Sequence, residues 1–214
     1  MIKVIIADDH PLVREGIKKV LVKGDLEIEV IGEASESEEL MDLLDKELPN
    51  LLILDIGMPG KSGLDMLNEI RQKYKDLRVL MLSMHPEDRF AVRALKAGAY
   101  GYLNKESVTG KLLNAIETIV NRNKRYISDK VAEQLVREVN EGESNTPHEK
   151  LSDREFEVMC MIASGKKIKE IAKDLSLSTR TIHTYRSRLM DKMGLRSNVA
   201  ITRYALTHQL IEEP

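Results

Sequence analysis

One apolar run that ends on a single carboxylate constrains the fold more than any other stretch of this chain. Residues 51–54 are four consecutive aliphatic residues, which is typical of a strand buried on both faces in a parallel sheet covered by helices. Asp55 follows directly, and the loop after it contains Gly57, Pro59, Gly60 and Gly63. Because ligands bind at the carboxyl ends of strands in open α/β sheets, Asp55 is a candidate functional residue. The alternative is that Asp55 only caps its own loop, as aspartates often do before Gly and Pro.

Strand and helix patterns alternate through the first part of the chain. Strands are predicted over residues 3–7, 29–33, 51–55, 78–82 and 99–103. Helices are predicted over residues 11–22, 36–45, 64–74, 86–97 and 108–120. Five strand–helix repeats with short connections predict a doubly wound, flavodoxin-like α/β fold, whose five-stranded parallel sheet has helices on both faces.

The rest of the chain is predicted to be helical. A helix over residues 128–139 precedes the polar stretch 140–149, which has almost nothing to bury and is predicted to be a flexible, solvated linker. Four more helices are predicted over residues 153–164, 168–175, 179–192 and 198–206. Glycines just beyond the first and the third of these are typical helix ends. The expected domains are an α/β unit of residues 1–121, a helical extension and linker of residues 122–148, and an all-α unit of residues 149–214.

Composition and charge narrow the classes of function. Residues 1–150 carry 22 Lys and Arg against 27 Asp and Glu, a net charge of −5, whereas residues 151–214 carry 11 against 8, a net charge of +3. Polyanion binding is therefore expected only in the second part. Apolar runs stay well short of the roughly 18 residues that a membrane helix needs, and the apolar start is too short for a signal peptide, so we expect a cytoplasmic protein. The single cysteine, Cys160, excludes a disulfide framework and a multi-cysteine zinc site.

Residues suited to a cation and a phosphoryl group occur at the predicted strand ends. Asp8 and Asp9 follow the first strand, Asp55 ends the third, Ser83 ends the fourth and Lys105 lies just beyond the fifth. The ends of strands one and three flank the switch point of a doubly wound sheet. Carboxylates brought together there raise one another's pKa unless a cation neutralises them, and Mg²⁺ suits a site with few carboxylates. An aspartate can accept a phosphoryl group when a metal, a lysine and a hydroxyl stabilise the transferred oxygens.

Each of these residues also has an ordinary structural interpretation. The Asp8-Asp9 pair can be a solvated turn, Ser83 a strand-end hydroxyl and Lys105 a surface charge. Their coincidence at successive strand ends favours the functional interpretation. His10 has no second histidine nearby in the sequence, and we interpret it as structural.

With these motifs, residues 1–121 resemble the receiver domain of bacterial two-component response regulators over its full length. The resemblance implies that Asp55 is the phosphoacceptor. It also implies that Asp55 holds Mg²⁺ together with Asp9 directly, Asp8 mainly through water, and the backbone carbonyl of Gly57. The resemblance further implies that Ser83 is the switch hydroxyl, Lys105 the lysine that contacts the phosphate, and Tyr102 the aromatic rotamer switch. Many receivers have a proline and a cis peptide bond after that lysine, where this chain has Glu106.

The third predicted helix of the all-α unit has an apolar stripe and a polar outer face. The stripe, which should pack on the other helices, consists of Ile182, Tyr185, Leu189 and Met193. The short helix and tight turn before it complete a helix-turn-helix arrangement, whose second helix enters the major groove of DNA. From the helices alone, a four-helix bundle with a solvated face is the alternative.

Sequence detail favours DNA binding over an ordinary bundle. Residues 151–155, 170–172 and 181–182, with Gly165 and Leu189, resemble the LuxR/NarL/FixJ-type DNA-binding domain across residues 149–211. The resemblance implies base contacts and phosphate contacts from one face of the helix, where the candidates are His183, Thr184 and Ser187 for bases, Thr181, Arg188 and Lys192 for phosphates, and Arg180 beside them. The last helix resembles the dimerisation helix of that class, with Val199 and Tyr204 as candidate contacts.

A receiver followed by this module is the order found in NarL/FixJ transcription regulators. We expect a phosphorylation-dependent DNA-binding regulator, not an enzyme, whose partners are a sensor histidine kinase, a double-stranded operator and a second copy of itself. Two alternatives stay open. A phosphatase of the haloacid-dehalogenase type also uses an aspartate nucleophile, but it needs a second acid two residues later, where this chain has Gly57. The other alternative is a receiver that is never phosphorylated and serves only for dimerisation.

Overall fold

A five-stranded parallel sheet forms the centre of the N-terminal part of the chain. The computed structural model describes residues 1–58, 61–84, 87–141, 146–208 and 210–211. The strands are β1 (Ile2–Ala7), β2 (Ile28–Ala34), β3 (Leu51–Asp55), β4 (Val79–Ser83) and β5 (Gly101–Asn104). All neighbours are parallel, in the order β2-β1-β3-β4-β5, which confirms the predicted flavodoxin-like arrangement. The strand order reverses between β1 and β3, so the carboxyl ends of these strands flank the switch point.

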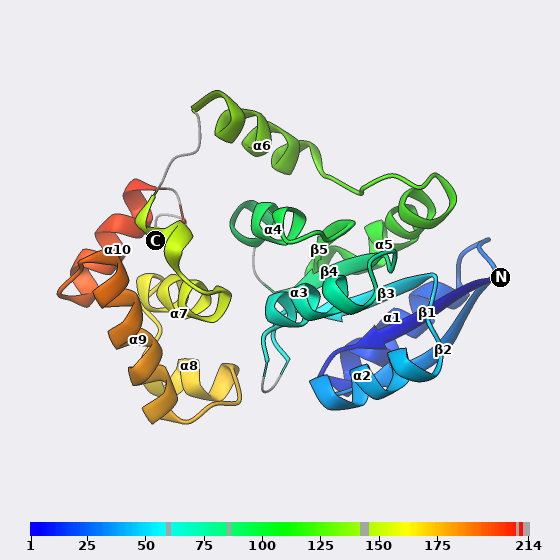
Figure 1. Cartoon of the computed structure of the whole chain (residues 1–214), viewed down its shortest axis with the longest axis horizontal. Coiled ribbons are helices and arrows are strands. Elements are labelled where there is room, and N and C mark those ends of the chain that lie inside the picture. The colour runs from blue at the N-terminus through cyan, green and yellow to red at the C-terminus, as the bar shows by residue number, and fades with distance from the viewer. Residues whose placement is uncertain (59–60, 85–86, 142–145, 209, 212–214) are drawn as a thin grey trace. The chain divides into compact units, whose positions relative to one another are not determined.

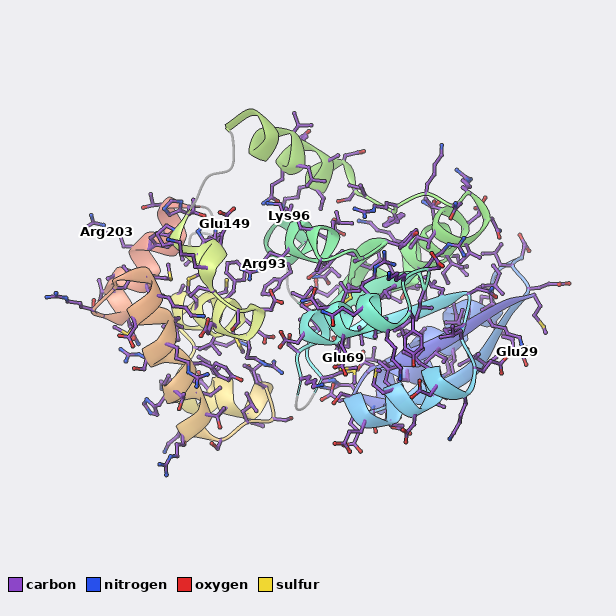
Figure 2. All side chains as sticks on the ribbon, in the orientation of Figure 1. Glu29, Glu69, Arg93, Lys96, Glu149 and Arg203 are labelled. Carbon is purple, nitrogen blue, oxygen red and sulfur yellow. The ribbon has the colours of Figure 1, made fainter. Side chains whose placement is uncertain are left out.

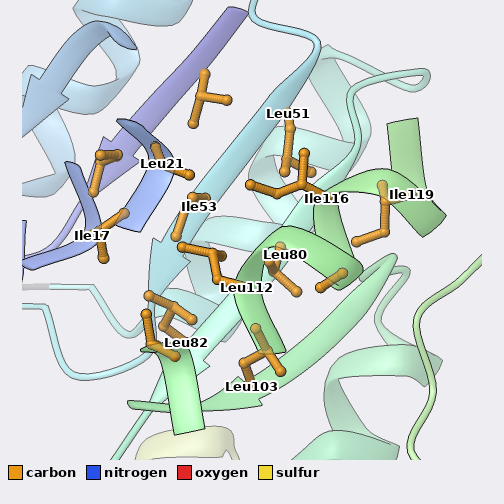
Figure 3. Packing of buried hydrophobic residues seen from close by; sticks show 14 residues of the cluster. Ile17, Leu21, Leu51, Ile53, Leu80, Leu82, Leu103, Leu112, Ile116 and Ile119 are labelled. Carbon is orange, nitrogen blue, oxygen red and sulfur yellow. The ribbon is translucent and has the colours of Figure 1, made fainter. Parts of the chain in front are cut away.

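Five helices cover the two faces of the sheet: α1 (Pro11–Val22), α2 (Ser37–Lys46), α3 (Gly63–Lys73), α4 (Glu87–Lys96) and α5 (Val108–Ile116). Helices α1 and α5 lie on one face, where Ile17 and Leu112 join the aliphatic side chains of the strands in one buried cluster (Figure 3). Helices α2, α3 and α4 lie over the other face (Figure 1). Every residue of β3 and β4 is buried, as the continuous apolar run predicted, because helices cover both sides of these strands.

The stretch predicted to be a flexible linker is partly folded. Helix α6 (Asp129–Glu141) covers its beginning, and residues 142–145 lie outside the described part of the chain. Residues Pro147–Lys150 form a 3₁₀ turn, where a solvated segment was predicted. The prediction was wrong there because one side chain of this polar segment packs against the C-terminal helices. His148 shares a hydrogen bond of 2.9 Å between Nδ1 and the Tyr204 hydroxyl, and its ring lies 6.1 Å from that of Phe156.

Four helices form the C-terminal part: α7 (Asp153–Ala163), α8 (Ile168–Asp174), α9 (Thr179–Met193) and α10 (Asn198–Thr207). Serine hydroxyls accept backbone hydrogen bonds at the starts of α7, α9 and α10. Gly165 and Gly194 have φ angles of +85° and +67°, a left-handed conformation that suits glycine and ends α7 and α9. Cys160 is buried, as expected of a core thiol. The chain divides into two compact units, residues 1–137 and 138–214. Throughout the described ranges, each helix is too short or too polar to cross a bilayer.

Candidate functional site

The ends of β1, β3 and β5 bring two carboxylates and one ammonium group together. Ala7 pairs with Leu54, so Asp8 follows β1 beside Asp55, the last residue of β3. Lys105 follows β5 and reaches across the end of β4. Its Nζ lies 2.7 Å from Asp8 Oδ2 and 2.9 Å from Asp55 Oδ2. All three side chains are at least 94% buried, so one cation balances two anions in a site that is almost closed to water.

Asp9 and His10 form the outer side of this site. His10 Nδ1 lies 2.6 Å from Asp9 Oδ1, and the His10 backbone N–H donates to Asp8 Oδ1 at 2.9 Å. Arg14 of α1 donates to the Asp8 carbonyl at 2.7 Å, which fixes the loop between β1 and α1. We interpreted His10 as structural from the sequence, yet its exposed ring contacts the acid pair. Its position directly after the two aspartates was the only signal for this contact.

Burial sets the charge properties of the site. Burial and the charge of Asp8 together raise the pKa of the Asp55 carboxyl to about 6, against the opposing effects of the Lys105 ammonium and the Gly57 backbone N–H. Burial acts on Lys105 in the opposite sense, since it disfavours the ammonium. The negative charges of Asp55 and Asp8 outweigh that effect and raise the pKa of Lys105. Lys105 therefore stays charged while Asp55 is the group poised to change its protonation.

The acid set offers oxygen ligands to a divalent cation. One ligand atom from each of Asp8, Asp9, His10 and Asp55 lies within 4.8 Å of the others. Asp8 Oδ2 and Asp9 Oδ1 are buried oxygens whose near neighbours are single nitrogen atoms, Lys105 Nζ at 2.7 Å and His10 Nδ1 at 2.6 Å. Buried carboxylate oxygens with free lone pairs are the ligands that Mg²⁺ prefers, so the residues present fit this ion.

The loop after β3 approaches the Asp55 residue closely at two glycines. A Cβ atom on Gly57 would lie 3.3 Å from Asp55 Oδ2. A Cβ atom on Gly63 would lie 2.2 Å from the Asp55 carbonyl oxygen, which no side chain can tolerate. The Gly63 N–H donates to the Ile56 carbonyl at 2.9 Å, and Ser62 caps the start of α3. Gly63 therefore seats α3 directly against the strand that carries Asp55, a role that the sequence analysis did not assign.

Ser83 and Tyr102 are buried on β4 and β5, the two strands that follow β3 across the sheet. Asp55 pairs with Leu82 in the β3–β4 ladder, so Ser83 lies one residue further along β4. Tyr102 pairs with Met81 on the other side of β4 and is only 4% exposed. The structure thus places Ser83 on the strand next to β3 and Tyr102 on the strand beyond it, at the strand positions predicted from the sequence.

In the second unit, α9 presents a polar face and buries the opposite one. Ile182 and Leu189 are fully buried, whereas the predicted base-contacting residues are exposed, namely His183, Thr184 and Ser187. Two of the hydroxyls on this helix already have partners. Thr181 Oγ1 lies 2.8 Å from the capping Ser178 Oγ, and Thr184 Oγ1 donates to the Arg180 carbonyl at 3.1 Å.

Lys192 differs from the other predicted phosphate contacts because it has an acidic partner within the unit. Its Nζ donates to Glu155 Oε2 at 2.6 Å and so ties α9 to α7. The backbone N–H of Ser152 donates to the same carboxylate at 2.8 Å. Burial raises the pKa of Glu155, but the hydrogen bonds from Lys192 and Ser152 outweigh it and hold this pKa below its ordinary value. Arg188, in contrast, is exposed on the outer face of α9.

Contacts between α9 and α10 were not predicted from the sequence. Arg186 Nε donates to Asn198 Oδ1 at 2.8 Å, which holds the start of α10 against α9. On α10, Val199 is 77% exposed, and Tyr204 is partly buried against His148. Figure 2 shows Arg203 projecting outward from the same helix.

A lysine-bridged pair of aspartates at the switch point of a doubly wound sheet, followed by a helix-turn-helix unit, defines a receiver with a DNA-binding output. Residues 4–117 match the family described as response regulator receiver domain, and residues 149–205 match bacterial regulatory proteins of the luxR family. The chain belongs to the response regulators of the NarL/FixJ class, which are DNA-binding transcription regulators of two-component systems.

Named relatives match over almost their entire lengths. The chain is 36% identical to response regulator GacA of Pseudomonas protegens over 213 residues, which are 99% of both chains. It is 34% identical to response regulator UvrY of Escherichia coli K12 over 213 residues, 98% of this chain and 96% of UvrY. RcsB of Salmonella enterica serovar Typhimurium, bound to promoter rprA in the presence of the phosphomimetic BeF₃⁻, superposes with a TM-score of 0.62 at 28% identity, covering 95% of this chain and 97% of RcsB.

The raised pKa of Asp55 predicts a pH-dependent gain of stability in the Asp55→Asn variant. A carboxyl whose pKa is raised on folding destabilises the folded state increasingly as pH rises from its ordinary pKa to its folded pKa. The neutral variant should therefore be more stable by about 1–3 kcal/mol above pH 6, and this gain should vanish below about pH 4. Urea unfolding of the full chain in EDTA measures it, with the exposed Asp25→Asn as control. A gain that does not change between pH 4 and pH 7 would contradict the assigned shift.

The Lys192–Glu155 contact predicts different outcomes for two basic residues of α9. Lys192→Ala should lower the unfolding free energy of the C-terminal unit by about 1 kcal/mol at pH 7, because Glu155 loses a charged partner. The depressed pKa of Glu155 makes this contribution present above about pH 4.5 and lost as pH falls further. Arg188→Ala is the matched control: stability should stay the same, while binding weakens on all DNA sequences and its salt dependence becomes shallower. Equal stability of the wild type and Lys192→Ala would show that the contact has no structural role.

Proposed function

We propose that Asp55 accepts a phosphoryl group from a sensor histidine kinase and that this modification promotes dimerisation and binding to a double-stranded DNA operator. One observation carries the proposal. Asp55 is buried beside Asp8 and Lys105 at the switch point of the sheet, in a chain whose second unit is a LuxR-type DNA-binding domain. The proposed boundaries are residues 1–121 for the receiver, 122–148 for the connection and 149–214 for the DNA-binding domain.

The reaction is a transfer of the phosphoryl group to a carboxylate oxygen of Asp55. A new P–O bond forms as the P–N bond of phosphohistidine breaks, and the leaving imidazole takes the bonding electrons and then a proton. Lys105, already 2.9 Å from Asp55 Oδ2, then holds one phosphoryl oxygen with its ammonium group. The Ser83 hydroxyl donates to another oxygen, and Tyr102 repacks beside it as an aromatic switch.

Mg²⁺ is the proposed cofactor. Asp9 and Asp55 would bind it through carboxylate oxygens, Asp8 mainly through water, and Gly57 through its carbonyl. The clustering of ligand atoms from Asp8, Asp9 and Asp55 within 4.8 Å of one another supports this assignment. A bound Mg²⁺ supplies positive charge for the acids and for the transferred oxygens, which lowers the cost of bringing a phosphoryl group to an acidic site.

Helix α9 is the proposed reader of the operator. His183, Thr184 and Ser187 face outward near its start, where residues of a recognition helix meet base edges. Arg180, Thr181 and Arg188 would contact phosphates and fix the register. Lys192 would contribute less to phosphate binding, because Glu155 already neutralises part of its charge. We propose the cytoplasm as the place of action, since the chromosomal operator lies there.

A second copy of the chain is the proposed partner for dimerisation through α10. Val199 is a large aliphatic side chain that is 77% exposed on this helix, which supports a contact there. A structure of RcsB is described as two dimers bound to two parallel DNAs. A dimer of the present chain would offer two α9 helices to half-sites about one helical turn apart.

We further propose that the protein does not act as a phosphatase. In the haloacid-dehalogenase type, a second acid two residues after the nucleophile protonates the leaving group, and Gly57 occupies that position here. Turnover of phosphomonoesters should therefore be absent.

Intact-mass analysis tests the assignment of Asp55. With Mg²⁺ and acetyl phosphate, or with a phosphorylated histidine kinase, the chain should gain one phosphoryl group, and Asp55→Asn should gain none. EDTA should abolish the reaction because the site then has only the Lys105 ammonium to offset the charges of the acids and of the incoming phosphoryl group. Lys105→Ala serves as a second variant, which should be modified more slowly. Equal phosphorylation of the wild type and Asp55→Asn would contradict the proposal.

A further inference from the structure

The segment between α5 and α6, residues 122–128, lies along β5; we call it the strap. It starts from an unusual helix end. Helix α5 continues into a π-helical turn, Glu117–Asn121, and the N–H of Lys124 donates to the Thr118 carbonyl at 3.0 Å. Asn123 then adopts a left-handed conformation with φ of +50°. The helix therefore ends abruptly, and the chain turns back towards the sheet.

Backbone contacts dock the strap on the outer edge of β5. The Tyr126 N–H donates to the Tyr100 carbonyl at 2.7 Å, and Tyr126 forms an isolated parallel bridge with Gly101. A Cβ atom on Gly101 would lie 3.0 Å from the Cβ of Tyr126, so the glycine permits this close approach. Two arginines add further contacts: Arg78 donates to the Asn123 side chain at 2.9 Å, and Arg125 to the Leu95 carbonyl at 3.3 Å.

At its other end the strap joins α4 to α6. Ser128 Oγ donates to Glu87 Oε2 at 2.6 Å, and Glu87 is the first residue of α4. The same serine starts α6, since its carbonyl accepts from Ala132 N–H at 2.9 Å. Val131, in the first turn of α6, is only 2% exposed. The start of α6 is thus fixed to the receiver by a charge-assisted hydrogen bond and a buried side chain.

Two of the strap's contacts involve residues close in sequence to the two proposed switch residues. Glu87 is four residues after Ser83, and Gly101 directly precedes Tyr102. A change at the phosphoryl site that moved Ser83 or Tyr102 would therefore occur within four residues of the positions that hold the strap. Helix α6 leads from the receiver to the DNA-binding unit. A change in the strap consequently alters the first part of the connection between them.

We propose that the strap couples the state of Asp55 to α6, with Ser128 and Glu87 as positioning residues and the Tyr126–Gly101 bridge as the second contact. This inference rests on the phosphorylation proposed above. Phosphorylation can shift the position of α6 only as far as the free energy of docking the strap differs between the two states of the receiver. Loss of the Ser128–Glu87 bond removes part of that difference and leaves the chemistry at Asp55 intact.

Amide hydrogen exchange of the full chain tests the coupling directly. Exchange of the amides of residues 124–132 is measured with Mg²⁺ alone and with Mg²⁺ and beryllium fluoride, while ¹⁹F NMR reports occupancy at Asp55. In the wild type, exchange of the Tyr126 and Ala132 amides should change at least fivefold on modification. In Ser128→Ala and in Glu87→Ala the change should fall below about twofold at equal occupancy, and Ser128→Thr should restore it. The double variant should lose no more than either single variant.

Ser35→Ala is the matched control, because Ser35 Oγ donates to Glu39 Oε2 at 3.0 Å in another Ser–Glu pair, outside the strap and α4. This variant should respond like the wild type. Full occupancy at Asp55 with unchanged exchange in the wild-type strap would overturn the coupling, as would a full response in Ser128→Ala. Absence of the fluoride signal at Asp55 would instead contradict the proposed phosphoryl site, so the two failures are distinguishable.

Discussion

The contact of Lys105 with both Asp8 and Asp55 is the interaction on which the receiver depends. Two ionised carboxylates buried side by side repel each other strongly. At a separation of 4 Å and an effective dielectric constant of 20, the repulsion between two unit charges costs about 4 kcal/mol. One ammonium group balances only one of them, so the site keeps a net negative charge. Burial and the charge of Asp8 raise the pKa of Asp55 for this reason, because the Lys105 ammonium does not fully offset them. A cation or a phosphoryl group changes this balance, and the site is sensitive for that reason.

The fold holds this imbalance in place through the ends of parallel strands. Register puts Asp8 beside Asp55, and the aliphatic residues of β3 and β4 fix those strand ends from both faces of the sheet. Gly63 lets α3 begin directly against the Asp55 backbone, where a side chain would collide. In the second unit, two contacts orient α9 and hence its polar face. They are the ion pair between α9 and α7 and the hydrogen bond between α9 and α10.

The parts that were predictable from the sequence follow from local patterns. The aliphatic run before Asp55 identified a strand buried on both faces, and the order of acids and Lys105 at successive strand ends identified the site. The contacts that could not be predicted join residues far apart in the sequence. Lys192 and Glu155 are 37 residues apart, and His148 and Tyr204 are 56 apart. A polar linker sequence gave no sign that His148 would be held by an aromatic ring on another helix. The strap likewise depends on pairing between Tyr126 and Gly101, which no periodicity reveals.

The central claim, that chemistry at Asp55 controls binding of DNA, is tested most directly by one titration series. The DNA is a fragment selected from random sequence by the chain treated with acetyl phosphate and Mg²⁺. Fluorescence anisotropy then measures its dissociation constant for the wild type and for Asp55→Asn, each with and without acetyl phosphate, at one salt concentration. The account predicts that phosphorylation tightens binding by the wild type at least tenfold and leaves Asp55→Asn unchanged. Equal affinity of the phosphorylated and unphosphorylated wild type, with phosphorylation verified by mass, would contradict it.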